Sequence, residues 1–182
     1  MLMRVAFSGQ VVGVLLWMSC SYGRADGTPS PTPAPELERL ASSVGVWDTT
    51  SRFRASPNSS PFESTSTYTV RWSESRQFLI SDQRGMTPEG WTSRILVTSW
   101  NPVDRKIDVI EVSRGGSTVE MTLWFEGDIQ KVLGYRHIGA QLVRTELTVE
   151  HMSPDACKFH TDCTDQGKTW VCSEGSSKRV SK

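Results

Sequence analysis

The segment Trp91-Thr-Ser-Arg-Ile-Leu-Val-Thr-Ser-Trp-Asn-Pro-Val-Asp-Arg-Lys-Ile-Asp-Val-Ile-Glu-Val-Ser113 decides the fold. Its two halves are rich in β-branched and aromatic residues, which favour strands. Between them, Asn101-Pro-Val-Asp-Arg105 contains the asparagine, proline and aspartate that are typical of a turn. The segment therefore predicts two strands, Trp91–Trp100 and Lys106–Ser113, joined as an antiparallel hairpin.

The same pattern continues on both sides of this hairpin. Beyond Gly45, runs with a period of two are separated by turn residues, and no connection has room for the helical crossover that a parallel sheet needs. Turn chemistry recurs at Arg114-Gly-Gly116, Gly127-Asp128 and Thr164-Asp-Gln-Gly167. About ten strands are expected, at Val46–Arg54, Phe62–Trp72, Arg76–Arg84, Trp91–Trp100, Lys106–Ser113, Ser117–Phe125, Ile129–Ile138, Gln141–His151, Cys157–Cys163 and Thr169–Ser173.

A row of antiparallel strands this long leaves two exposed edges unless it closes on itself. Closure removes the edges, so the sequence favours an all-β fold with a closed antiparallel up-and-down barrel. A sandwich of two sheets remains the alternative, because alternation alone does not distinguish the two folds.

One short helix is expected before the first strand. In Glu36–Val44 the apolar residues recur at the spacing of one helix face, Pro35 suits the first turn and Gly45 suits the end. The preceding residues 26–35 alternate proline with small residues, which predicts an extended tether. The barrel domain is therefore expected to cover residues 36–182, with the helix plugging one end.

Residues 1–25 have the features of a secretion signal. Arg4 precedes an apolar stretch, Val11–Met18, and small residues end at Ala25. The stretch is too short to span a bilayer, which takes about 20 residues. We therefore expect cleavage after Ala25, a periplasmic or secreted protein and no membrane span. Lipidation of Cys20 is the alternative and would anchor the protein to a membrane.

The charge balance argues against a nucleic-acid partner. Without residues 1–25 the chain carries 18 basic and 20 acidic residues, because only Arg4 and Arg24 are removed. No cluster of lysine and arginine provides the basic face that a phosphate backbone requires.

Several short segments resemble one bacterial family. Gly45-Val-Trp47, at the junction of the helix and the first strand, resembles the G-x-W signature of lipocalin-like, or calycin, barrels. Over residues 36–182 the chain resembles the family called domain of unknown function 1579. Other segments that carry this resemblance are Leu37-Glu-Arg-Leu40, Trp100-Asn-Pro-Val-Asp-Arg-Lys106, Ser153-Pro-Asp155 and Asp165-Gln-Gly-Lys-Thr-Trp170.

This resemblance implies architecture more than chemistry. It implies a closed barrel, export in many members and no established activity. In related barrels the signature tryptophan packs beneath an arginine of the last strand, which implies a structural cation–π pair between Trp47 and Arg179. A neighbouring group of barrels that binds haem has a glycine after the tryptophan, where this chain has Asp48. We therefore expect no cofactor.

Strand alternation predicts which side chains point into the barrel. The predicted inward set combines aromatic residues with hydroxyl residues, so it could enclose one small, partly apolar molecule. A core filled by these same side chains is the alternative. The inward set is Trp47, Thr49, Ser51, Phe53, Phe62, Ser64, Ser66, Tyr68, Val70, Trp72, Phe78, Ile80, Met121, Leu123, Phe125, Tyr135 and Phe159.

Noncatalytic binding inside the barrel is the leading functional hypothesis, since aromatic side chains offer large contact areas and Tyr and Trp add a polar group. An interaction module of the cell envelope, working through the rim or outer surface, is the first alternative. The residues predicted to form the wall of the ligand cavity are Tyr68, Trp72, Met121, Phe125 and Tyr135.

A small-substrate enzyme is the weaker alternative. Asp82, Arg84, Glu111 and Glu146 fall on registers that could point inward. The chain has no nucleophile elbow, P-loop or dinucleotide fingerprint, and no catalytic residue is assigned. No metal site is predicted either, because the three histidines lack the spacing of metal ligands: His137, His151 and His160.

Three cysteines follow Ala25. Cys157 and Cys163 are six residues apart on one predicted strand, about 20 Å at 3.3 Å per residue, which is beyond the reach of a disulfide. Cys172 lies nearly opposite Cys163 across a turn, and export favours oxidation. We therefore predict a Cys163–Cys172 disulfide and a free Cys157.

Overall fold

The structure is a computed structural model that describes residues 32–88, 90–138 and 141–181. The predicted secretion signal and the alternative lipidation site at Cys20 lie outside the described residues. Most of the predicted tether, residues 26–35, also lies outside them. Within the described part, Pro33 is buried and Ala34 packs against the core, so the chain is already packed before Glu36.

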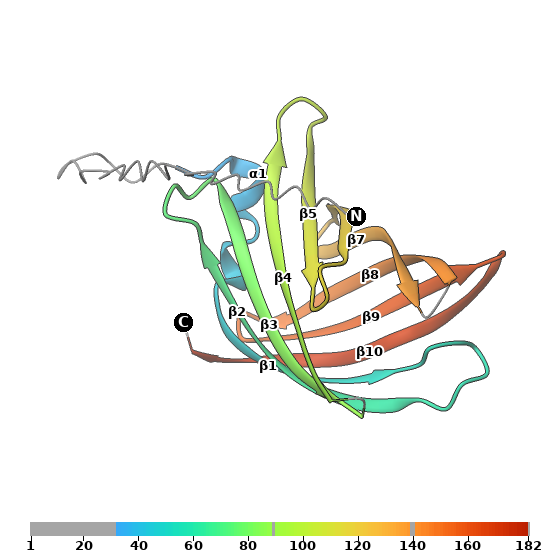
Figure 1. Cartoon of the computed structure of the whole chain (residues 1–182). Coiled ribbons are helices and arrows are strands. Elements are labelled where there is room, and N and C mark those ends of the chain that lie inside the picture. The colour runs from blue at the N-terminus through green and yellow to red at the C-terminus, as the bar shows by residue number, and fades with distance from the viewer. Residues whose placement is uncertain (1–31, 89, 139–140, 182) are drawn as a thin grey trace, which may run out of the picture.

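The described residues form ten antiparallel strands that close into an up-and-down barrel, as predicted (Figure 1). Each strand pairs with its neighbours in sequence, and β1 pairs with β10 to close the ring, which rules out the sandwich. The strands are β1 Gly45–Phe53, β2 Phe62–Trp72, β3 Phe78–Thr87, β4 Gly90–Asn101, β5 Lys106–Ser113, β6 Thr118–Glu126, β7 Ile129–Ile138, β8 Gln141–Ser153, β9 Ala156–Asp165 and β10 Lys168–Ser181.

The predicted helix is shorter than expected and divided in two. α1 covers Pro35–Glu38, and a 3-10 turn follows at Ala41–Ser43. Leu37 and Leu40 are buried in the core, so the predicted apolar face points inward. In Figure 1 the helix lies at one end of the barrel, beside β4.

Contacts between the helix and neighbouring turns hold α1 on that end of the barrel. Arg39 donates a hydrogen bond of 2.6 Å to the carbonyl of Gly127, and its guanidinium carbon lies 3.9 Å from the ring centre of Phe125. Arg76, between β2 and β3, lies 3.9 Å from the carboxylate of Glu38. We call the end of the barrel that α1 covers the closed end.

The inward register is confirmed on β1 and β2 and is wrong on β3. Val70 pairs with Ser81 and Trp72 pairs with Leu79, so Leu79 and Ser81 point inward. Phe78 and Ile80 therefore point outward, against the prediction. The predicted strand began at Arg76, whereas the backbone there has φ of 55° and belongs to the turn.

Candidate functional site

The barrel interior contains a cavity of about 230 Å³ between the closed end and the middle of the strands. Leu40 and Ser43 close it on the side of the helix. Its wall is mainly apolar, with nine aliphatic residues and three larger side chains at Trp47, Tyr68 and Met121. The aliphatic wall residues beyond Leu40 are Val70, Leu79, Leu96, Val109, Leu123, Val132, Leu147 and Val149.

The five residues predicted for the cavity wall divide into three groups. Tyr68 and Met121 line the cavity. Trp72 and Phe125 are partly buried and pack against the core, but they do not line the cavity. Tyr135 is 57% exposed on the outer face, so the prediction for it is wrong.

Tyr135 points outward because its neighbour points inward. Gly134 pairs with Met121, and a Cβ atom on Gly134 would lie 2.3 Å from the Cγ of Met121. The Met121 side chain occupies the space that a larger residue would need at position 134. Sequence alternation cannot show this, because a glycine has no side chain to mark the inward face.

A charged cluster forms the polar part of the wall. The carboxylate of Glu111 lies 3.2 Å from Nη1 of Arg94 and 3.3 Å from Nη2 of Arg136. The Glu111 side chain is only 5% exposed, whereas those of Arg94 and Arg136 are 37% and 30% exposed. Solvent therefore reaches the cluster from the arginine side, and the carboxylate lies deeper.

Burial and charge act in opposite directions on Arg94. Loss of hydration lowers the pKa of its guanidinium, as does the positive charge of Arg136, and the Glu111 carboxylate raises it. Arginine remains protonated in proteins, so the cluster holds two positive charges and one negative charge.

Hydrogen bonds extend the cluster across the barrel. Arg94 Nε donates to Gln83, and Gln83 Nε2 donates to Ser66 at 2.8 Å. Ser113 donates to Glu111 at 3.1 Å. Strands β2 to β5 thus supply a continuous polar band beside the apolar wall.

A second polar group surrounds Tyr68 and extends from β2 to β1 and β10. Thr49 and Ser177 share a hydrogen bond of 2.8 Å, and both interact with the Tyr68 hydroxyl. Burial raises the pKa of Tyr68 to about 12 and also raises the pKa of the Cys157 thiol. Both groups are therefore neutral at pH 7, and Cys157 lacks the thiolate character of a nucleophile.

Of the four charged residues considered for inward positions, only Glu111 is inside the barrel. Asp82 and Arg84 form an exposed ion pair of 3.5 Å. Glu146 lies 2.9 Å from Arg144 and also pairs with Lys131 on the outer face. These three side chains therefore lie on the outer face, against the prediction. Their strands have apolar residues on both faces, so alternation alone does not determine which face points inward.

Arg94 and Arg136 line the cavity but were not among the residues predicted for it. A signal was available, because Arg94 shares its face of β4 with Leu96, Thr98 and Trp100. An arginine in the register of an apolar series marks an inward charge. Nothing local, however, shows that both arginines contact Glu111, since they lie on β4 and β7.

The closed end contains the predicted pair of Trp47 and Arg179. The guanidinium carbon lies 4.6 Å from the ring centre of Trp47, which is 1% exposed. Trp47 Nε1 donates to Ser43 at 2.8 Å, and Arg179 donates to Val44 at 2.7 Å and pairs with Asp155 at 3.0 Å. These contacts join β1, β10 and the N-terminal segment.

The cysteines follow the prediction. Cys163 and Cys172 form a disulfide with a Cα–Cα distance of 5.6 Å, and Cys157 is free and buried. The disulfide packs with Val143 and Trp170 in a small apolar cluster away from the cavity.

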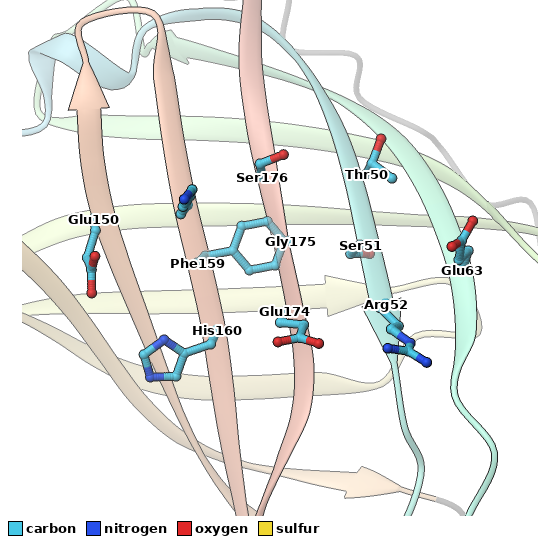
Figure 2. Close-up of a pocket in the computed structure, with 11 residues that line it drawn as sticks. Thr50, Ser51, Arg52, Glu63, Glu150, Phe159, His160, Glu174, Gly175 and Ser176 are labelled. Atoms are coloured by element: carbon cyan, nitrogen blue, oxygen red, sulfur yellow. The ribbon is translucent and has the colours of Figure 1, made fainter.

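A larger, open depression of about 550 Å³ lies over β8, β9, β10, β1 and β2 (Figure 2). Figure 2 shows charged and titratable side chains in a row across these strands: Glu150, His160, Glu174, Arg52 and Glu63. Glu174 is opposite both His160 and Arg52, and Arg52 is opposite Glu63, so the row contains compensating cross-strand pairs.

Among the described residues, no group of three or more metal-ligating side chains comes together. His137 is exposed, and only His151 of the three histidines lines the cavity. In the same part of the chain, none of the helices has the length and apolar character to cross a membrane.

The closed ten-stranded barrel is a lipocalin-like fold, and two solved structures share this fold. Rv2717c from M. tuberculosis matches with a TM-score of 0.59 and 15% identity, over 81% of this chain and 99% of that chain. The S-type phycobiliprotein lyase CPES from Guillardia theta matches with a TM-score of 0.53 and 16% identity, over 80% and 91%. No family model and no curated protein matches the sequence.

Proposed function

We propose that this protein binds a small, partly apolar molecule inside the barrel and does not act on it chemically. The cavity of about 230 Å³ carries the proposal, because its wall is mainly apolar and has a few polar groups on two sides. Binding sites for small molecules have this composition. A cavity of this size favours ligand binding over a core packed solid.

The chemistry of the wall supports binding over catalysis. Tyr68 and Cys157 are neutral at pH 7 because burial raises the pKa of each. Glu111 is held by two guanidinium groups and the hydroxyl of Ser113. Tyr68, Cys157 and Glu111 are therefore each protonated or occupied by hydrogen bonds, which favours binding over proton transfer at these groups.

Purification from the natural host tests this proposal. Native mass spectrometry should find a retained small molecule, and titration should change the tryptophan fluorescence, because Trp47 lines the cavity. Val109→Phe fills the cavity and should abolish retention. Val112→Phe is the matched control, since Val112 lies on the outer face of the same strand and is 43% exposed. Equal retention by both variants would contradict the proposal.

An interaction module is the second candidate, and one feature of the outer face favours it. Ile95 pairs with Val112 across β4 and β5, both are more than 40% exposed, and Trp91 at the end of β4 is 65% exposed. Adjacent exposed apolar side chains mark protein contacts. If this face is the functional surface, Trp91→Ser and Ile95→Ser should abolish the biological role while ligand retention stays intact.

We also propose that the protein is exported and belongs to the family called domain of unknown function 1579. The sequence features of residues 1–25 and the Cys163–Cys172 disulfide support export. The Gly45-Val-Trp47 signature and the barrel support the family. N-terminal sequencing of the periplasmic or secreted fraction should begin at Asp26, whereas a lipid-modified chain beginning at Cys20 would establish the anchored alternative.

A further inference from the structure

The charge of the cavity wall points to the chemistry of its ligand. Apart from His151, the titratable residues that line the cavity are Tyr68, Cys157, Arg94, Arg136 and Glu111. Tyr68 and Cys157 are neutral, as shown above. Two guanidinium groups against one carboxylate leave one uncompensated positive charge beside an apolar wall. The two guanidinium groups are only partly exposed, so the surplus positive charge is incompletely screened by water and favours a partner that carries one negative charge.

The hydrogen-bonding capacity of the cluster is also incomplete. Glu111 already accepts from Arg94, Arg136 and Ser113. Arg136 uses Nη2 for Glu111 and for the Met121 sulfur at 3.3 Å, while its buried Nε has no hydrogen-bond partner among the described residues. Buried donors without partners are rare in native proteins, so the protein does not saturate the guanidinium of Arg136, and recognition of a ligand falls to the terminal nitrogens that solvent reaches.

We propose that the barrel binds a small monocarboxylate, with the carboxylate at Arg94 and Arg136 and the apolar body against the aliphatic wall. The planar fork of arginine matches the two oxygens of a carboxylate. The two arginines are the partly exposed members of the cluster, so the carboxylate lies toward solvent and the apolar body extends toward Trp47. This inference rests on the proposed function as a ligand-binding barrel.

The cavity volume limits the size of the apolar body. An apolar cavity of about 150 Å³ binds benzene, which has six carbon atoms. In proportion, the cavity of about 230 Å³ holds roughly nine non-hydrogen atoms. Heptanoate has this size, and heptanamide has nearly the same shape without the charge, so the two form a matched pair of probes.

Isothermal titration calorimetry with the full chain tests the proposal. Heptanoate should bind at least about 10-fold more tightly than heptanamide, since hydrogen bonds to charged groups contribute more than those between neutral groups. Equal affinity for the two probes would overturn the carboxylate proposal and leave the binding function standing. Failure of both probes to bind, in protein that thermal unfolding shows to be folded, would overturn both.

Variants test whether the carboxylate binds at the cluster of Arg94, Arg136 and Glu111. Arg136→Met should weaken heptanoate about 10-fold and change heptanamide by less than about 2-fold, because only the anion uses the guanidinium. Arg84→Met is the matched control, since it removes the same charge from the outer face, where Arg84 pairs with Asp82. Equal losses of heptanoate affinity in the two variants would show that only the overall charge matters and would overturn the proposal.

A second variant gives an effect of the opposite sign. Glu111→Gln keeps the shape of the side chain and raises the surplus charge of the cluster, so heptanoate should bind more tightly while heptanamide is unchanged. Weaker heptanoate binding by a folded Glu111→Gln protein would contradict the proposed role of the surplus charge. This comparison stays decisive if Arg136→Met does not fold, as does the comparison of the two probes with the unmodified protein.

Discussion

The closed end and the charged half of the barrel interior are built differently. At the closed end, Leu37, Leu40 and Trp47 are fully or almost fully buried, and guanidinium groups lie against aromatic rings. In the charged half, Arg94 and Arg136 flank Glu111 and leave a cavity beside them. The difference teaches that the tightly packed end forms the floor of the cavity, through Leu40 and Trp47, whereas the charged cluster forms part of its side wall.

This division has an energetic reason. Burial of apolar surface stabilises a fold by about 25 cal/mol per Å², whereas a buried ion pair often contributes little after its loss of hydration. The closed end should therefore carry a larger share of the stability than the charged half. Truncations at the two levels should have different consequences, the first on unfolding and the second on binding.

The largest expected effect is at the closed end. Trp47→Ala should lower the free energy of unfolding by about 3 to 5 kcal/mol, because it empties a fully buried site and removes the ring beneath Arg179. Urea unfolding measures this change. Trp91→Ala is the matched control, since Trp91 is exposed, and it should change stability by less than about 0.5 kcal/mol. Similar losses in both variants would show that burial of Trp47 at the closed end does not account for its contribution to stability.

The disulfide should have the next largest effect. Cys163→Ala combined with Cys172→Ala should cost about 2 to 3 kcal/mol, because the bond closes a loop between residues nine positions apart. The unmodified protein in reductant should unfold like the double variant, and reductant should not affect the double variant. If reductant does not change the stability of the unmodified protein, the bond is absent in the purified protein. A thiol assay of the denatured, unreduced domain should then detect more than the single thiol of Cys157.

Strand boundaries could be predicted where turn residues frame a run of β-forming residues. The bounds of β2, β5 and β7 match the prediction. β10 continues eight residues beyond the predicted end at Ser173, through Glu174-Gly-Ser-Ser177, which lacks β-forming side chains. Its pairing with β1 and β9 extends it. A Cβ atom at Gly175 would lie 2.3 Å from the carbonyl oxygen of Thr50, so close approach to β1 requires the glycine.

Register was predictable only where polar and apolar residues alternate. Phe78-Leu-Ile80 is apolar at all three positions, so either face satisfies the pattern, and pairing with β2 decides that Leu79 points inward. The candidate site depended on more distant contacts. Tyr68 could be placed on the wall from its own strand, but the cluster around Glu111 needs the closed ring that brings β4 and β7 together.

A smaller effect is expected at the boundary between the two regions. Gly134→Ala should destabilise the protein by about 1 to 2 kcal/mol, because the new methyl group displaces the flexible Met121 side chain. Met121→Ala removes the obstruction, so the two substitutions together should cost less than the sum of the separate costs. A double-mutant cycle by urea unfolding measures this coupling. Additive costs would show that Met121 does not restrict position 134.

The smallest expected effect is the pH dependence that Tyr68 contributes. Burial raises its pKa from 10.0 to about 12, so the folded state holds the phenol proton more tightly than the unfolded state. Well below pH 10 the phenol is protonated in both states and the contribution to stability is complete. As the pH rises from 10 toward 12, the unfolded chain loses the proton first, and the stability falls.

At pH 10.5 this linkage should lower the free energy of unfolding by about 1 kcal/mol relative to pH 9. The drop should be smaller by that amount in Tyr68→Phe, which keeps the ring and removes the ionisable group. Urea unfolding of both proteins at the two pH values isolates the contribution, because every other titrating group is common to them. Equal drops would mean that water reaches the Tyr68 hydroxyl, and the polar wall around Thr49 and Ser177 would then be an open surface instead of a buried face of the cavity.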